Sequence, residues 1–142
     1  MEAIKVAILG ASGYTGMELV RLLLGHPAAQ ITAATSRANA GRRIDRVFPR
    51  FAHLPGSQLP FIEPDMEAVA ASGATVAFLA LPHGTAAEYA TSLLGKGLRV
   101  IDLSADFRLR KASELEEFYV VAHPAPDLLD SAVYGLPEWR RE

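Results

Sequence analysis

Gly10-Ala11-Ser12-Gly13-Tyr14-Thr15-Gly16 is the stretch that decides the fold of this chain. An apolar run at 4–9 precedes it and an amphipathic pattern at 17–24 follows it, so the sequence predicts a strand, a glycine turn and a helix. Such a unit suits a dinucleotide, because the pyrophosphate must meet bare backbone N–H groups at a helix N-terminus. Two interpretations stay open, since turns without a ligand also favour glycine and the G-x-x-G-x-x-G spacing departs from the commonest fingerprint.

The composition limits the classes of protein to which the chain can belong. Its 142 residues suffice for one domain with a core, and the 50% hydrophobic and 21% charged residues are typical of a globular protein. The net charge of −2 gives no basic footprint for nucleic acid or for an anionic membrane surface. No apolar run approaches the ~20 residues that span a bilayer, and no signal-type segment precedes the first strand, so we expect a cytoplasmic protein.

The rest of the chain alternates short apolar runs with helical patterns. Three more buried strands are expected, at 30–35, 75–80 and 98–103. Helices are expected at 65–70, from Thr85 to about Leu94 and from Ser113, the last two opening with the spacing of a capping box. The order predicts an α/β fold of the Rossmann type, with a doubly wound, mainly parallel sheet and helices on both faces. We expect one dinucleotide-binding domain over residues 1–142.

Two segments fit this alternation poorly. Glycine and proline interrupt residues 37–60, which we expect to form a surface excursion with at most one helical turn, or a short strand at 59–62. The proline-rich tail from residue 123 is expected to be an exit segment with a short strand at 132–134.

The end of the second predicted strand carries Thr35-Ser36-Arg37, where a carboxylate would bind the 2′-hydroxyl of NAD. A guanidinium beside hydroxyl groups suits a 2′-phosphate instead, so the sequence favours NADP over NAD. The alternative is a solvated arginine on a surface loop. Four further arginines of the excursion are expected to be solvated or interfacial: Arg42, Arg43, Arg46 and Arg50.

Two more segments follow predicted strands, at the sheet edge where open α/β sheets bind ligands. Within Leu81-Pro82-His83-Gly84, the histidine suits a contact with the nicotinamide half of a cofactor or with a substrate, or it caps a helix end. Within Ser104-Ala105-Asp106-Phe107-Arg108, the arginine suits a phosphate or carboxylate, and Asp106 is either its partner or a turn residue.

The residues that bind metals or attack substrates are scarce in this chain. It contains no cysteine, which excludes disulfides, thiolate metal sites and a cysteine nucleophile within these residues. His26, His53 and His123 lack the spacing of metal ligands and are expected at the surface. The sequence therefore predicts no metal site.

Several motifs together resemble the N-acetyl-γ-glutamyl-phosphate reductase family of arginine biosynthesis. They run in order over nearly the whole chain: the glycine stretch 10–16, Thr35-Ser36-Arg37, Ala80-Leu81-Pro82-His83-Gly84, Val100-Ile101-Asp102-Leu103-Ser104-Ala105-Asp106-Phe107-Arg108 and Tyr134-Gly135-Leu136-Pro137-Glu138. The last two segments are far more specific than the glycine turn.

The resemblance implies roles for these residues. The pyrophosphate of NADP would be held by Gly10, Ser12, Gly13, Tyr14, Thr15 and Gly16, and the 2′-phosphate by Ser36 and Arg37. The residues beside the cofactor would be Leu81, Pro82, His83 and Gly84. The acyl-phosphate substrate would meet Arg108, with Ser104 as a second candidate. None of these residues can be the nucleophile.

The implied reaction is the NADPH-dependent reduction of N-acetyl-glutamyl phosphate to the semialdehyde, in which a thiolate attacks, phosphate leaves and a histidine handles the protons. In that family the cysteine and histidine lie in a second domain, which follows the segment resembling 134–138. The enzyme is expected to form homo-oligomers through this second domain. We therefore expect the 142-residue chain to be the NADP-binding domain and to be inactive alone. Alternatives are a related carrier-bound aminoadipyl-phosphate reductase, an aspartate-semialdehyde dehydrogenase, or a non-catalytic NADP-binding module.

Overall fold

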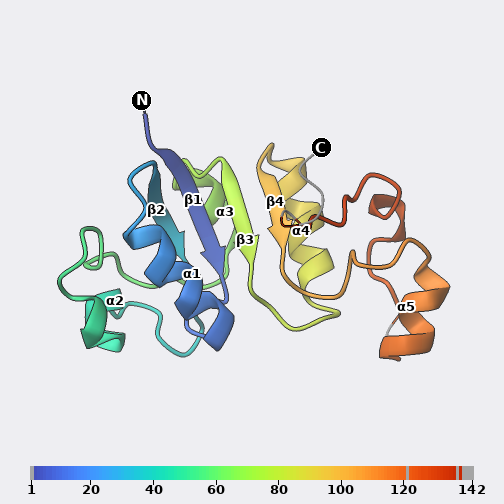
Figure 1. The fold of residues 1–142 in the computed structure, drawn as a ribbon, viewed down its shortest axis with the longest axis horizontal. Coiled ribbons are helices and arrows are strands. Elements are labelled where there is room, and N and C mark those ends of the chain that lie inside the picture. The colour runs from blue at the N-terminus through green and yellow to red at the C-terminus, as the bar shows by residue number, and fades with distance from the viewer. Residues whose placement is uncertain (1, 121, 137, 139–142) are drawn as a thin grey trace.

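Four parallel strands form one sheet in the order β2-β1-β3-β4 (Figure 1). The strands are β1 (Ile4–Leu9), β2 (Ala29–Ala34), β3 (Val76–Leu79) and β4 (Arg99–Asp102), in a computed structural model that describes residues 2–120, 122–136 and 138. From β1 the chain moves outward to β2 and then crosses to β3 on the other side of β1. This reversal makes the sheet doubly wound, as predicted, and places a topological switch point between β1 and β3.

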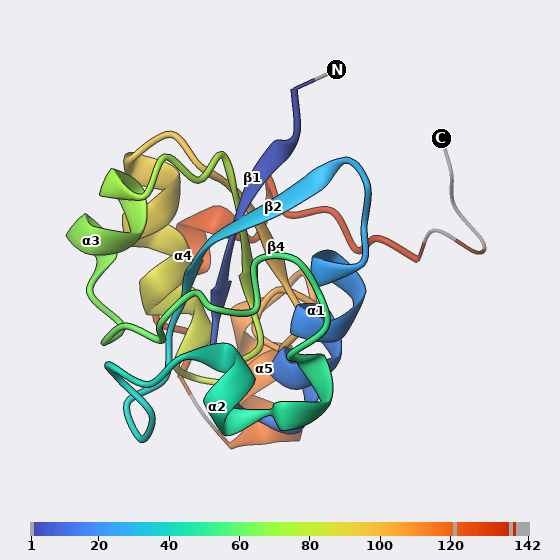
Figure 2. The same cartoon turned by 90° about the vertical axis from the view of Figure 1, so that its left-hand side faces the viewer.

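Helices cover both faces of the sheet. The helices are α1 (Tyr14–Leu24), α2 (Ile44–Val47), α3 (Met66–Ala71), α4 (Ala86–Gly95) and α5 (Ala112–Tyr119), of which α5 lies away from the sheet, beyond α4 in Figure 1. Figure 2 shows α1 and α2 on one side, and α3 and α4 on the other. Each face buries its own apolar cluster, with Val20 and Phe61 on the α1 side and Val69 and Leu93 on the α3–α4 side. None of the helices among the described residues is long and apolar enough to cross a membrane.

The excursion between β2 and β3 is more structured than expected. It holds α2 and a 3₁₀ turn at Pro49–Phe51, so the expectation of at most one helical turn was wrong. Ile44, Phe51 and Phe61 are almost fully buried against the α1 face, which explains why this segment has a fixed path. In place of a strand at 59–62, isolated bridges join Pro60 to Arg43 and Ile62 to Thr35.

Three local predictions in the second half of the chain were wrong. Thr85 precedes α4, but its side chain makes no capping hydrogen bond. Helix α5 begins at Ala112, one residue before Ser113, and the side chain of Lys111 in the N-cap position makes no capping hydrogen bond either. Residues 132–134 lie beside β4 without ladder hydrogen bonds and form no strand. Pro137, part of the last resembling segment, lies outside the described residues.

Candidate functional site

The carboxyl ends of the four strands meet at one edge of the sheet, because all of the strands are parallel. The segments that leave this edge carry every predicted site residue: the loop 10–13 and the first residues of α1, 14–16, after β1, and the loops 35–37 after β2, 80–84 after β3 and 103–108 after β4. In Figure 1 the arrowheads of β1, β2 and β4 point to this edge at the bottom of the view. The structure therefore brings the predicted segments to one ridge.

The three glycines of the turn have different roles. Gly10 has a φ of +77°, and a Cβ there would lie 2.3 Å from the carbonyl oxygen of Ala80. A Cβ on Gly16 would lie 2.1 Å from the carbonyl oxygen of Gly10. Gly10 therefore allows the turn to pack against the end of β3, and Gly16 allows α1 to pack against the turn. Gly13 has a φ of −73°, and the nearest atom to its Cβ position is 3.5 Å away. Of these three glycines, only Gly13 has room for a Cβ without a clash.

The N-terminus of α1 is free of competing side chains. Gly13 is its N-cap, no side chain accepts a hydrogen bond there, and the first turn contains no acidic residue. The first-turn N–H groups of a helix have no intrahelical partner and carry the positive end of the helix dipole. This helix end is therefore suited to an anion such as a pyrophosphate.

The loop after β2 is tied to the glycine turn. The hydroxyl of Thr35 accepts a hydrogen bond from the Gly10 N–H at 3.2 Å, and the Ser12 and Ser36 hydroxyls are hydrogen-bonded at 2.7 Å. Ser36 is buried, and its oxygen also accepts a bond from the backbone N–H of Asn39. Ser36 therefore shapes the loop from within. Its neighbour Arg37 is exposed at the surface of the same loop.

Asp106 supplies the cap that Thr85 does not. Its carboxylate is fully buried and accepts hydrogen bonds from the N–H of Gly84 at 2.7 Å and of Ala87 at 3.0 Å. These bonds satisfy the start of α4 from a loop that comes about 20 residues later. The interpretation of Asp106 as a partner of Arg108 was wrong. Asp106 joins the loop after β4 to the loop after β3.

Asp106→Ala is expected to lower the free energy of unfolding by about 2–4 kcal/mol, because the buried N–H of Ala87 and the partly buried N–H of Gly84 lose a charged acceptor. Asp106→Asn is expected to cost less, since the amide oxygen still accepts one bond. Urea unfolding of the three proteins checks this. A loss below about 1 kcal/mol for the alanine variant would show that water replaces the carboxylate at no cost.

His123 is buried, so the expectation that it lies at the surface was wrong. Its Nε2 donates to the carbonyl oxygen of Asp106 at 2.7 Å, and its Nδ1 accepts from the N–H of Ala125 at 3.0 Å. This pairing requires the tautomer with the proton on Nε2. The ring also packs edge-on against Phe107, so His123 holds the loop that carries Arg108.

His83 and Arg108 approach each other through Tyr119 at the end of α5. His83 is exposed, and its ring centroid lies 5.6 Å from that of Tyr119. The Tyr119 hydroxyl lies 3.4 Å from an Arg108 nitrogen, a long hydrogen bond, while another Arg108 nitrogen lies 3.5 Å from the carbonyl oxygen of Ser104. The predicted cofactor-side and substrate-side residues therefore border one surface. Leu81, Pro82 and Gly84 complete the loop beneath His83.

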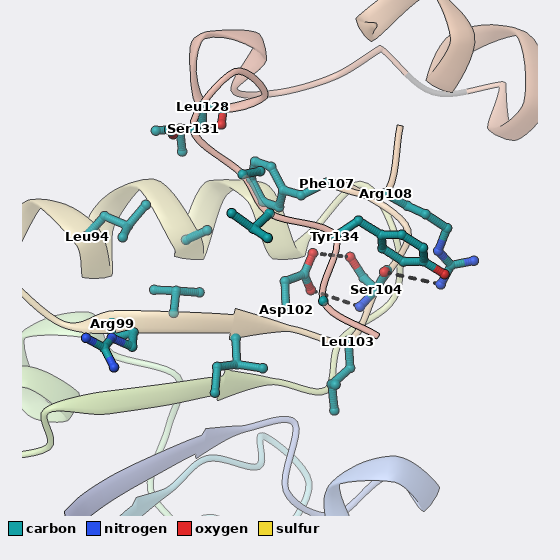
Figure 3. Close-up of a pocket in the computed structure, with 16 residues that line it drawn as sticks. Leu94, Arg99, Asp102, Leu103, Ser104, Phe107, Arg108, Leu128, Ser131 and Tyr134 are labelled. Atoms are coloured by element: carbon teal, nitrogen blue, oxygen red, sulfur yellow. Dashed lines mark hydrogen bonds between the residues drawn. The ribbon is translucent and has the colours of Figure 1, made fainter. Parts of the chain in front are cut away.

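A groove of about 790 Å³ runs along β4 from this surface. Figure 3 shows Ser104, Arg108 and Tyr134 gathered at one end of it, close to Asp102. The Asp102 carboxylate accepts bonds from the N–H of Ser104 at 2.9 Å and from its hydroxyl at 2.8 Å. Burial raises the pKa of Asp102 above its usual value, although these two hydrogen bonds oppose the shift. The groove thus offers an arginine, a hydroxyl and apolar walls.

Two residues at this edge, and the role of a third, were not predicted from the sequence. Tyr89 bonds to Arg37, Tyr119 joins His83 to Arg108, and Asp106 caps α4. The position of Asp106 in the loop after a strand could have indicated a role at this edge. No spacing in the sequence indicates the partners of the two tyrosines. The described residues contain no group of three or more side chains that could hold a metal ion.

Comparisons with known proteins agree with this geometry. The model of the family described as "Semialdehyde dehydrogenase, NAD binding domain" matches residues 5–142. The chain is 58% identical over all its 142 residues to an N-acetyl-gamma-glutamyl-phosphate reductase of Akkermansia muciniphila, covering 41% of that protein. It is 51% identical over 140 residues to the reductase of Ectopseudomonas mendocina, covering 98% of this chain and 40% of that protein.

A solved structure shows the same fold at low sequence identity. Aspartate semialdehyde dehydrogenase with NADP from Candida albicans superposes with a TM-score of 0.62 and 20% identity, over 85% of this chain and 40% of that one. Among the curated relatives, the chain spans about 40% of the length of the two reductases described above.

Proposed function

The chain belongs to the semialdehyde dehydrogenase family, as its NAD-binding domain, and from this premise we propose that it binds NADP(H) for an N-acetyl-γ-glutamyl-phosphate reductase. The observation that carries the cofactor proposal is the uncapped N-terminus of α1 beside Gly13, with Arg37 on the adjoining loop. The identity of 58% over the whole chain supports the choice of substrate, because the aspartate semialdehyde dehydrogenase is only 20% identical.

The residues present fit a dinucleotide phosphate. The first-turn N–H groups of Tyr14, Thr15 and Gly16 would hold the pyrophosphate, and a side chain on Gly13 would fill the space it needs. Gly10 and Gly16 shape the turn, and Ser12 and Ser36 brace it. Arg37 would bind the 2′-phosphate through charge-assisted hydrogen bonds. Among the described residues, no carboxylate lies within ion-pairing distance of Arg37 to compete with a phosphate.

The substrate side of the proposed site lies at the end of β4. When bound, NADPH supplies the hydride that reduces an activated acyl group to an aldehyde. Arg108 would orient the acyl phosphate by pairing with its phosphate group, and Ser104 would donate or accept a hydrogen bond beside it. Leu81 to Gly84 would lie next to the nicotinamide half, held in place by Asp106. These residues bind and orient, and none of them is a thiol nucleophile.

The 142-residue chain is expected to bind NADPH without oxidising it when N-acetyl-glutamyl phosphate is added. The thiolate route needs a cysteine, which these residues do not contain. Fluorescence titration with NADPH measures binding. The decrease in NADPH absorbance over time, at a fixed enzyme concentration, measures turnover. The comparison protein is the chain extended to the length of its relatives.

The outcomes separate the candidate functions. Turnover by the 142 residues alone would contradict the thiolate route. An extended protein that ignores N-acetyl-glutamyl phosphate but reduces aspartyl phosphate or a carrier-bound aminoadipyl phosphate would move the assignment to that relative. An extended protein that binds NADPH and reduces none of the three would favour a binding module.

A further inference from the structure

Tyr89 of α4 contacts Arg37 across the carboxyl edge of the sheet. A guanidinium nitrogen of Arg37 donates to the Tyr89 hydroxyl at 3.2 Å, joining residues 52 positions apart in sequence. The two residues come from separate parts of the fold, since Arg37 follows β2 at one edge of the sheet and α4 packs on β3 and β4. The hydrogen bond therefore joins a loop on the β2 side of β1 to a helix that packs on the strands at its other side.

We propose that Tyr89 is a positioning residue that holds Arg37 for a 2′-phosphate and so sets the preference for NADP over NAD. This inference rests on the proposed function. An exposed arginine loses about 2 kcal/mol of rotamer entropy when a ligand fixes it. A hydrogen bond that already restrains the guanidinium removes part of that loss before the ligand arrives.

The chemistry of a phenol suits this role better than that of a carboxylate. A carboxylate partner would neutralise the guanidinium and compete with the phosphate for its N–H donors. The phenol oxygen is neutral and engages one nitrogen, so the positive charge and the remaining donors stay available for bidentate contact. Arg37 is thus restrained without being neutralised.

Tyr89 is itself held in place. Its ring is partly buried against the apolar cluster on the α3–α4 face. Two residues earlier on the same helix, the N–H of Ala87 is fixed by the Asp106 carboxylate at 3.0 Å. The hydroxyl therefore projects from a rigid first turn of α4 rather than from a loop.

Tyr89→Phe tests the proposal, because it removes the hydroxyl and keeps the ring packed against the apolar cluster. We expect NADPH to bind about fivefold more weakly and NADH to change less than about twofold, since the lost bond involves a charged donor. The melting temperature should stay unchanged. Thr91→Val on the same helix, whose hydroxyl donates to the carbonyl oxygen of Ala87 at 3.0 Å, is the control and should change neither affinity.

A double-mutant cycle with Arg37→Ala separates positioning from direct contact. If Tyr89 acts through Arg37, Tyr89→Phe should have no further effect on NADPH affinity in the Arg37→Ala background. A fivefold loss that persists there would show that Tyr89 touches the cofactor itself and would overturn the positioning role. Equal losses for NADPH and NADH, or a lowered melting temperature, would show a structural role only.

The same titrations distinguish failure of this inference from failure of the proposed function. If wild-type protein prefers NADPH and Arg37→Ala abolishes the preference while Tyr89→Phe leaves it intact, only the role of Tyr89 is wrong. If wild-type protein shows no preference for NADPH, the assignment of the 2′-phosphate site to Arg37 fails, and the inference fails with it.

Discussion

Arg37→Glu is expected to weaken NADPH binding by a factor on the order of a hundred and to leave NADH binding within about twofold. The glutamate removes the charge-assisted bonds to the 2′-phosphate and adds a like charge next to it. The same carboxylate can accept a hydrogen bond from the free 2′-hydroxyl of NADH. Calorimetric titration of both cofactors, at one fixed ionic strength, measures the two affinities.

Arg46→Glu is the matched control for this charge reversal. Arg46 is exposed on α2 in the same excursion, so both variants change the net charge of the chain by the same amount. Long-range electrostatics alone would weaken NADPH binding in both. A loss confined to Arg37→Glu assigns the effect to local contact, whereas equal losses for NADPH and NADH in that variant would contradict the assignment.

The strands and the parallel sheet could be predicted because their determinants are local. Short apolar runs bounded by turn residues marked the ends of all four strands to within one residue. The helix expected at 65–70 is α3, and Asp65 is its N-cap. The excursion could not be predicted, since Phe51 and Phe61 are fixed by packing on α1, which no local pattern records. The missing strand at 132–134 has the right composition, but these residues make no ladder bonds with β4.

The site was predicted as a set of loops and not as a network. Placing each motif after a strand was enough to bring the loops to one edge, because parallel strands end together. The bonds that fix those loops connect distant residues: Asp106 to the start of α4, His123 to Asp106, and Tyr89 to Arg37. For α4 the capping-box spacing predicted Thr85 as the cap, but the buried carboxylate of Asp106 accepts the hydrogen bonds at the start of this helix instead.

The glycine turn offers a pair of variants that separate folding from cofactor binding. Gly16→Val is expected to destabilise the chain by more than about 3 kcal/mol, because its Cβ would lie 2.1 Å from the carbonyl oxygen of Gly10. Gly13→Val meets no such clash, since its φ is −73° and the nearest atom is 3.5 Å from the Cβ position. The two substitutions add the same side chain to the same turn.

Gly13→Val is therefore expected to fold normally and to bind both NADPH and NADH on the order of a hundredfold more weakly, because the isopropyl group occupies the space of the pyrophosphate. Both cofactors carry that group, so this variant loses affinity without losing selectivity, in contrast to Arg37→Glu. Gly95→Val, at the far end of α4, is the control and should bind normally, because a Cβ there would meet no atom within 4 Å outside its chain neighbours and its own helix backbone. Thermal unfolding with titration of both cofactors checks all three proteins, and a folded Gly13→Val chain with unchanged affinity would show that the turn serves the fold alone.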